Sequence, residues 1–403
     1  RCQDLPRLSE ETTNLLLEKH TFKELLADVE QRNLQNNIVG LEASRLFARS
    51  EINMGVDAFR DSLYAMLKRN TFLNIKFENM LDTLGEMSRT DLYSYLKEWE
   101  QLTPLPFYSI GEPELTKVVN KGGEEFFVLK VLVSNNSDYD GIIQMNVLQN
   151  GWWYQPMEDP RARKKVEIAA HTSKEFVSVW EEQIRDVEIN TMVSGNLPYM
   201  IRQSIGNVKQ ERNKIVKDTI YTLPESSLEM PGEVIVDNED STLFVLSTPA
   251  VVGLLPKWLD KVEDTSFKYS GISWWRAPLQ WTATTNAKYY GKYIRSAYVI
   301  KSGDGSQTAT WKIPVPEAGQ YELYYHVFKD DELRWNDRLQ GEYHFRVAYD
   351  SEMEDAYINL RKANEGWEQL GTYYFSADTV RVVLTDECKL RSVTADAVKI
   401  VKR

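Results

Sequence analysis

The chain has 403 residues, of which 42% are hydrophobic, a share that excludes intrinsic disorder and is sufficient for two or three packed domains. It carries 60 acidic against 48 basic residues, for a net charge of -12. Because a nucleic-acid backbone attracts the opposite charge, we expect no nucleic-acid partner. No apolar run reaches the roughly 18 residues that a spanning helix needs, so we expect no membrane span.

Residues 9 to about 100 show the apolar spacing of amphipathic helices. One stripe recurs every three to four residues and consists of Phe59, Leu63, Met66 and Leu67. Two basic residues and an asparagine follow at 68–70, an arrangement typical of a helix C-terminus. Pro104 and Pro106 then end the helical pattern. We therefore predict an N-terminal helical bundle over residues 1–105.

From Tyr108 onward, apolar and polar residues alternate with the period of two that is typical of β-strands. We predict a small β-sandwich over residues 107–205, a polar linker over residues 206–231, and a further β domain over residues 232–403. The predicted fold class is multidomain α+β, in which the helical bundle is followed by two antiparallel β-sandwich domains.

Ordered motifs punctuate the last domain. They are Val236-Asp237-Asn238-Glu239-Asp240, Ala318-Gly319-Gln320-Tyr321, Gly366-Trp367 followed by Leu370-Gly371, and Ala395-Asp396-Ala397-Val398. In this order they resemble the golvesin C-terminal-like domain, which also occurs on xanthan lyase-like proteins. The resemblance covers residues 232–403. It implies a jelly-roll-like β-sandwich that is accessory to a larger protein.

A second resemblance lies in the helical region. The stretches at residues 57–63 and 91–99 look like the helical segment that follows the catalytic domain in aminopeptidase N-like zinc peptidases, over roughly residues 36–110. Such peptidases need His-Glu-x-x-His on a helix. None of the chain's four histidines is followed by Glu, and no two are four residues apart. We therefore expect no catalytic residues here, and any zinc site would lie upstream of Arg1.

Three carboxylates are candidate metal ligands. Asp237 and Glu239 lie near the start of the last domain, and Asp396 lies near its end. If the first and last strands pair, these oxygens meet, and oxygen ligands are what calcium requires. One interpretation is thus a structural calcium site. The other is a polar turn at residues 238–240 with Asp396 capping a loop.

Aromatic side chains are candidate sugar-binding residues, because aromatic rings stack on the C–H faces of pyranose rings. The candidates with loop character and polar neighbours are Trp274, Trp275, Trp281, Trp335, Asn336 and Arg338. The alternative is that these tryptophans fill the sandwich core or its ends, where we also expect Trp311 and Trp367.

Two hypotheses about function follow. The first is a non-catalytic accessory region of a larger bacterial protein, periplasmic or on the cell surface, which recognises polysaccharide or cell-envelope material. The second is the non-catalytic C-terminal part of an aminopeptidase N-like or transporter-linked peptidase. In both hypotheses this chain carries out no chemistry of its own.

Overall fold

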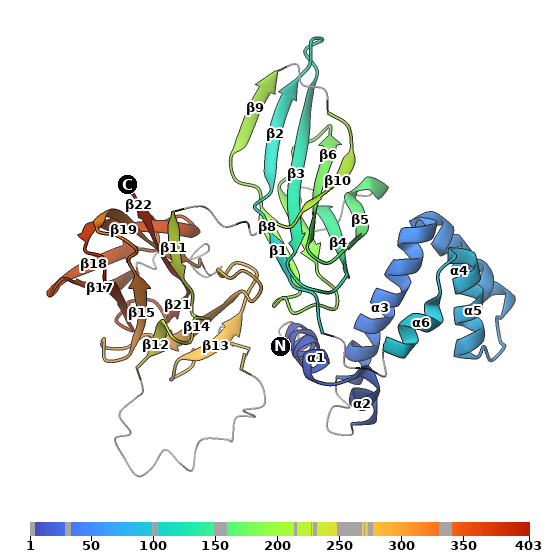
Figure 1. Cartoon of the computed structure of the whole chain (residues 1–403), viewed down its shortest axis with the longest axis horizontal. Helices are drawn as coiled ribbons and strands as arrows, with labels where there is room; N and C mark the ends of the chain where they lie inside the picture. The colour runs from blue at the N-terminus through green and yellow to red at the C-terminus, as the bar shows by residue number, and fades with distance from the viewer. Residues whose placement is uncertain are drawn as a thin grey trace. The chain divides into compact units, whose positions relative to one another are not determined.

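The computed structural model describes residues 5–28, 34–98, 101, 104–148, 159–212, 216–226, 228, 232–247, 268–269, 271–272, 277–329 and 341–403. Within them the chain forms two compact units that divide at residues 228 and 229 (Figure 1). The fold is multidomain α+β, as predicted: helices come first and antiparallel sheets follow.

The helices of the first unit confirm the amphipathic pattern. Their bounds are α1 Leu5–Lys19, α2 Phe22–Ala27, α3 Gln35–Met54, α4 Val56–Arg69, α5 Phe77–Ser88 and α6 Leu92–Glu98. A capping box between Thr21 and Glu24 starts α2. Gly55 separates α3 from α4 with a φ of 85°, a conformation that favours glycine. The predicted stripe is largely inward, since Phe59 and Met66 pack with Leu81, Leu84 and Leu92.

The helical region packs directly on the sandwich that follows it. Ala48 of α3 is buried against Ile142 and Met192 of the β region. Lys165 pairs with Glu51, and both side chains are largely buried. The two predicted domains, 1–105 and 107–205, therefore lie in one compact unit.

This sandwich has two sheets. The larger has the order β10-β6-β3-β2-β9, with β1 also pairing β3, and the smaller has the order β5-β4-β7-β8. The bounds are β1 Tyr108–Ile110, β2 Glu114–Val119, β3 Glu125–Asn135, β4 Gly141–Leu148, β5 Arg163–Ile168, β6 Thr172–Trp180, β7 Asp186–Asn190, β8 Met200–Ser204, β9 Val208–Arg212 and β10 Thr219–Pro224. Tyr108, Phe176 and Trp180 are among the buried residues between them.

The linker predicted over residues 206–231 is wrong over much of its length. β9 pairs in parallel with β2, and β10 pairs antiparallel with β6, so both complete the larger sheet at its two edges. The polar composition of residues 206–231 favours a linker, and three charged residues of β9 contribute to it. Edge strands commonly carry such residues, because charge there discourages pairing with another chain.

The second unit is also built from sheets. Their orders are β11-β22-β16-β19, β12-β15-β20-β17-β18 and β13-β14-β21. The bounds are β11 Glu233–Val236, β12 Phe244–Leu246, β13 Thr282–Thr285, β14 Ser296–Lys301, β15 Thr308–Pro314, β16 Gly319–Val327, β17 Glu342–Tyr349, β18 Glu352–Asn359, β19 Gly366–Phe375, β20 Thr379–Thr385, β21 Ser392–Ala395 and β22 Val398–Lys402. Pairing between strands far apart in sequence is typical of Greek-key and jelly-roll sandwiches.

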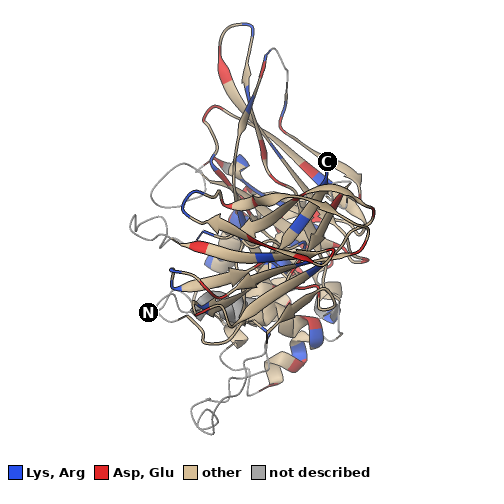
Figure 2. Ribbon diagram, turned by 90° about the vertical axis from the view of Figure 1, so that its left-hand side faces the viewer, with Lys and Arg blue, Asp and Glu red and all other residues tan. Residues whose placement is uncertain are grey.

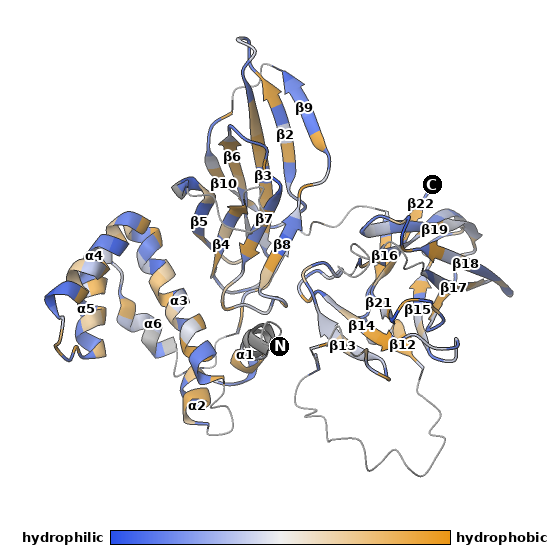
Figure 3. Cartoon of the chain, turned by 180° about the vertical axis from the view of Figure 1, so that it is seen from behind, coloured by the Kyte–Doolittle hydropathy of each residue, from blue (hydrophilic) through white to orange (hydrophobic). Residues whose placement is uncertain are grey.

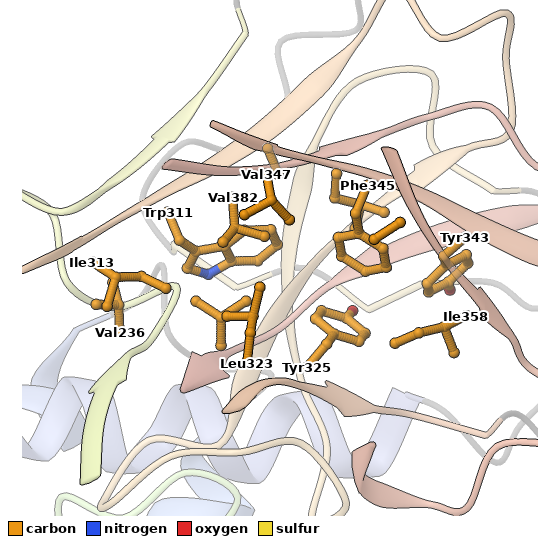
Figure 4. Packing of buried hydrophobic residues seen from close by; sticks show 14 of the residues in the cluster. Val236, Trp311, Ile313, Leu323, Tyr325, Tyr343, Phe345, Val347, Ile358 and Val382 are labelled. Carbon is orange, nitrogen blue, oxygen red and sulfur yellow. The ribbon is translucent and has the colours of Figure 1, made fainter. Parts of the chain in front are cut away.

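The core of the second unit lies between the four-stranded and the five-stranded sheet (Figure 4). Trp311 of β15 is fully buried, as predicted, and its ring meets those of Phe244 and Tyr325. Its indole N–H donates to the carbonyl oxygen of Asp396 at 3.2 Å. One indole thus fills the core and also fixes the connection between β21 and β22.

Charges of both signs are interspersed along the strands and helices (Figure 2). Within the described residues, no helix has the length and apolar character needed to cross a bilayer.

Candidate functional site

The three predicted carboxylates converge at one end of the second unit. Asp237 follows β11 directly, and Asp396 follows β21 directly, with one residue between it and β22. β11 and β22 pair antiparallel with Val236 opposite Val398, so the expected closeness of the two acids is present. Burial raises the pKa of Asp237 well above its usual value, and the Asp396 carboxylate raises it further.

Glu239 is held by one cation and two hydroxyls. Its carboxylate pairs with the Lys268 ammonium and accepts a hydrogen bond from the Tyr269 hydroxyl at 3.1 Å and another from the Ser296 hydroxyl. Burial, followed by the charge of Glu239, raises the pKa of Tyr269. Glu239 therefore has three protein partners.

Asp396 is fully buried and pairs with a histidine that the sequence did not link to it. His326 Nδ1 lies 2.8 Å from one carboxylate oxygen, and the Tyr290 backbone N–H donates to both oxygens at 3.2 Å. Burial raises the pKa of Asp396, and His326 opposes that rise. Asp396 thereby fixes the position of His326 and of the loop that carries Tyr290.

Among the described residues, no group of three or more His, Cys, Asp or Glu is arranged to hold a metal ion. Two of the three candidate ligands already pair with side chains of the protein: Asp396 with His326, and Glu239 with Lys268. Calcium binding at Asp237, Glu239 and Asp396 stays a prediction.

Most of the predicted sugar-binding residues lie outside the described residues: Trp274, Trp275, Trp335, Asn336 and Arg338. Trp281 is described, and it is partly buried against the hydrophobic core. Its indole nitrogen is buried with no partner among the described residues. For Trp281 the geometry favours core filling over ligand stacking.

Trp367, predicted to fill the sandwich core or one of its ends, is not part of the core between the sheets and lies on the solvent-facing side of the four-stranded sheet. It is half-buried and stands opposite His326 in the β16–β19 pairing. The reason is a β-bulge, in which Leu323 pairs with Gly371 and Tyr324 with Gln369, so that Leu370 is the extra residue. An extra residue reverses the side to which the following residues point. The Trp367 side chain therefore points to the opposite side of the sheet from those of Tyr373 and Phe375.

Around Trp367 lies a cluster that we call the aromatic face, made of Tyr290, Tyr324, His326, Trp367 and Lys399. The Trp367 ring centroid lies 5.0 Å from that of Tyr290 and 5.1 Å from that of His326. The Lys399 ammonium lies 4.8 Å from the centroid of Trp367 and 5.4 Å from that of Tyr324. The cation thus bridges the two rings.

Polar groups border the aromatic face. Lys399 pairs with Glu233 at 2.8 Å, and the pair is largely buried: the Lys399 side chain is 12% exposed and that of Glu233 is 18% exposed. The Tyr324 hydroxyl donates to Glu322 at 2.6 Å, and Arg403 pairs with Glu322 at 2.9 Å. The hydrogen bond from Tyr324 lowers the pKa of Glu322, because it stabilises the charged carboxylate. The rings are therefore held in place by charged partners.

The comparisons with known proteins address this unit. Residues 275–402 match the golvesin C-terminal domain. The second unit therefore carries a golvesin-like domain, as its motifs predicted, and all five residues of the aromatic face lie within the matched range. A search of curated proteins gave no match.

Solved structures give only partial likenesses. A GH26-CBM35 β-(1,4)-mannanase of Podospora anserina is 11% identical, with 43% of this chain and 28% of that chain covered and a TM-score of 0.22. A CBM35 from Cellvibrio japonicus is 12% identical, with 28% and 75% covered and a TM-score of 0.20. A Bacteroides uniformis β-glucuronidase 2 is 11% identical, with 77% and 32% covered and a TM-score of 0.21.

At these scores the likenesses carry no conclusion about ligand or activity. This chain spans about a third or less of the mannanase and the glucuronidase. None of these matches supports the resemblance of residues 36–110 to aminopeptidase N-like peptidases, which stays a prediction.

Proposed function

We propose that the golvesin-like domain binds carbohydrate on the aromatic face, and that the chain is a non-catalytic, extracytoplasmic accessory region of a larger protein. The observation that supports this most strongly is the position of Trp367. Its ring is on the outer side of a sheet whose inner side already has a complete core. An indole in that place adds little to core packing and is suited to contacts with a ligand.

The aromatic face has the chemistry that sugar recognition needs. Pyranose rings present C–H groups to an aromatic ring and hydroxyl groups to neighbouring polar atoms. Trp367 and Tyr290 supply rings, while Glu322 and Gln369 supply hydrogen-bonding groups on the same side of the sheet. Because the buried Asp396 fixes His326 and the Tyr290 backbone, little conformational freedom is lost on binding.

A sheet surface also favours a polymer over a small sugar. Small ligands are bound mostly in concave sites that bury most of their surface. Four of the five residues of the aromatic face lie on neighbouring strands of one sheet, β16, β19 and β22, and Tyr290 lies on the loop between β13 and β14. A polysaccharide strand can lie along these strands. Polysaccharide or related cell-envelope material is therefore the proposed ligand.

The titratable groups on and around the aromatic face form ion pairs. His326 pairs with Asp396, Lys399 with Glu233, and Glu322 with Arg403. A glycosidase or lyase needs an acid or base poised toward its substrate. We therefore propose binding and positioning as the role of this chain.

The experiment is a binding panel with the full chain. Immobilised neutral and acidic polysaccharides are probed by biolayer interferometry with wild type, Trp367→Ala and Tyr357→Ala. Tyr357 is an exposed tyrosine on the five-stranded sheet, so it is the matched control. We expect about a tenfold loss for Trp367→Ala, equivalent to about 1.4 kcal/mol, and no loss for Tyr357→Ala.

Several outcomes would contradict the proposal. One is binding that survives Trp367→Ala unchanged. Another is binding that depends on Tyr357 alone. Equal and negligible binding across the whole panel would also count against it. Thermal melts of each variant show whether a loss of binding reflects unfolding.

The second hypothesis, a C-terminal region of an aminopeptidase N-like protein, is favoured by one feature. The helical packet leads at once into a sandwich and packs on it through α3, the order that the resemblance implies. This parentage is compatible with carbohydrate binding by the last domain. A His-Glu-x-x-His motif encoded upstream of Arg1 would support it, and an unrelated upstream sequence would exclude it.

A further inference from the structure

Exposed apolar residues gather where α4 connects to α5. We call this group the apolar tip; it consists of Tyr64, Leu67, Phe72, Leu73 and Phe77. Phe72 is fully exposed, and Leu73 is 65% exposed. In Figure 3 the connection between α4 and α5 carries orange, hydrophobic residues. Single exposed apolar residues need no explanation, whereas a contiguous group marks an interaction surface.

The connection is held in a defined shape. The Asn70 side chain donates to the Met66 carbonyl at 2.8 Å, and the Thr71 hydroxyl donates to the Lys68 carbonyl at 2.9 Å. The Leu73 N–H donates to the Asn70 carbonyl at 2.9 Å. Phe72 has a φ of 65°, which is unusual and costly for a bulky side chain. The turn thus projects Phe72 outward at a cost in backbone strain.

Basic residues lie between the residues of the apolar tip in the sequence. Lys68 and Arg69 end α4, Lys76 precedes α5, and all three are exposed. Residues 68–77 contain three cations and no acid, in a chain whose net charge is -12. Glu78 is the next acid along the chain. The charge around the apolar tip is therefore opposite to that of the chain as a whole.

We propose that the apolar tip docks on a membrane surface that contains anionic lipid, with Phe72 and Leu73 entering the interface and the three basic residues contacting head groups. Apolar insertion and basic attraction each give weak binding, and together they give stable binding. A peripheral contact of this kind requires no spanning helix.

A protein partner fits this surface less well. Specific protein interfaces bury at least about 1,000 Å² in total, with a well-packed centre. The apolar tip is a single turn and its adjoining helix ends, with five apolar side chains. A bilayer accepts a few projecting side chains without needing a complementary pocket, so the lipid surface is the partner to which we commit.

The test is sedimentation of the full chain with sugar-free vesicles, so its result is independent of carbohydrate binding. Vesicles of phosphatidylcholine alone are compared with vesicles that contain phosphatidylglycerol. We expect binding only to the anionic vesicles, with a decrease at high salt. Replacing Lys68, Arg69 and Lys76 by Gln should weaken partitioning about a hundredfold.

The apolar contribution is tested by Phe72→Ser with Leu73→Ser, which should weaken partitioning at least about tenfold. Met353→Ser, at an exposed site on β18, is the matched control and should change nothing. Thermal melts and size-exclusion chromatography accompany each variant. Equal binding of wild type and tip variants, or equal binding to both vesicle types, would overturn the proposal. So would a dimer that the Phe72 and Leu73 changes abolish.

Discussion

Replacing Asp237 by Asn is expected to stabilise the golvesin-like domain near neutral pH. Burial and the neighbouring Asp396 raise the pKa of Asp237 well above its usual value. Asn keeps the shape of the side chain, and its oxygen can still accept the hydrogen bond that the Asn238 N–H donates at 2.7 Å. The change therefore removes a disfavoured charge and retains the local geometry.

The sign of the pH dependence follows from the direction of the pKa shift. Between the unfolded pKa and the raised folded pKa, the folded state holds a proton that the unfolded state has lost. Stability is therefore greatest below the unfolded pKa and falls as the pH rises toward the folded pKa. The amide that replaces the carboxyl group in Asp237→Asn cannot ionise, so this decrease is absent from the variant. The advantage of the variant should be small near pH 4 and grow with pH.

We expect Asp237→Asn to raise the free energy of unfolding by about 1–2 kcal/mol near pH 7. This is the cost of burying a polar group that lacks a full set of hydrogen bonds, discounted because Asp237 is only half-buried. For a domain of this size, 1 kcal/mol corresponds to about 2–4 °C in melting temperature, so we expect a rise of about 2–8 °C. The assay is scanning calorimetry of the full chain in EDTA from pH 4 to pH 8. An unchanged or lower melting temperature at pH 7 would refute the reasoning.

Asp378→Asn is the matched control. Asp378 is exposed, and its carboxylate accepts a hydrogen bond from the following N–H at 2.7 Å, as that of Asp237 does. We expect no pH-dependent gain from it. The same series tests the calcium prediction. Calcium should raise the melting temperature of wild type and leave that of Asp237→Asn unchanged. Equal wild-type melting temperatures in calcium and in EDTA would exclude the calcium site.

Two further predictions concern other parts of the chain. Gly371→Ala should destabilise the golvesin-like domain by about 1–3 kcal/mol, because the added Cβ would lie 2.8 Å from the Tyr373 ring; an unchanged denaturant midpoint would contradict this. His171 should titrate above the ordinary pKa of histidine, because hydrogen bonds to Asp138, first, and to Glu225 raise its pKa. The stabilisation that His171 gains from these two carboxylates is present at acidic pH and is lost as pH rises through the raised pKa of His171. Asp138→Asn should lower that pKa in an NMR titration, and an unshifted curve would exclude the pairing.

Much of the fold could be predicted from periodicity. The spacing of two predicted the sandwiches, and the pairing of first and last strands predicted that Asp237 would approach Asp396. Charge density was a poorer guide, because the edge strand β9 has the sequence Val-Lys-Gln-Glu-Arg, a charged composition that is also typical of a linker. Regular alternation would leave Trp367 on the same side as Phe375, and only the bulge at Leu370 reverses it.

A bulge depends on how two strands pair, and that pairing is set by the packed sheet, not by the residues of one strand. The role of His326 was missed for a related reason. Its partner Asp396 is 70 residues away, and the two meet only because β16 and β22 are neighbours. The sequence signal that was present is a polar residue at an outward position of β16, next to Tyr325, which faces the core.

The most direct test of carbohydrate binding is to observe individual indole groups by NMR while a polysaccharide found in the binding panel is added. The Trp367 indole signal, assigned with Trp367→Phe, should shift in proportion to bound ligand. The signal of the Trp311 indole, which is buried and donates a hydrogen bond to the Asp396 carbonyl, should not shift. A titration that moves other indole signals and leaves that of Trp367 unchanged would contradict the proposed site.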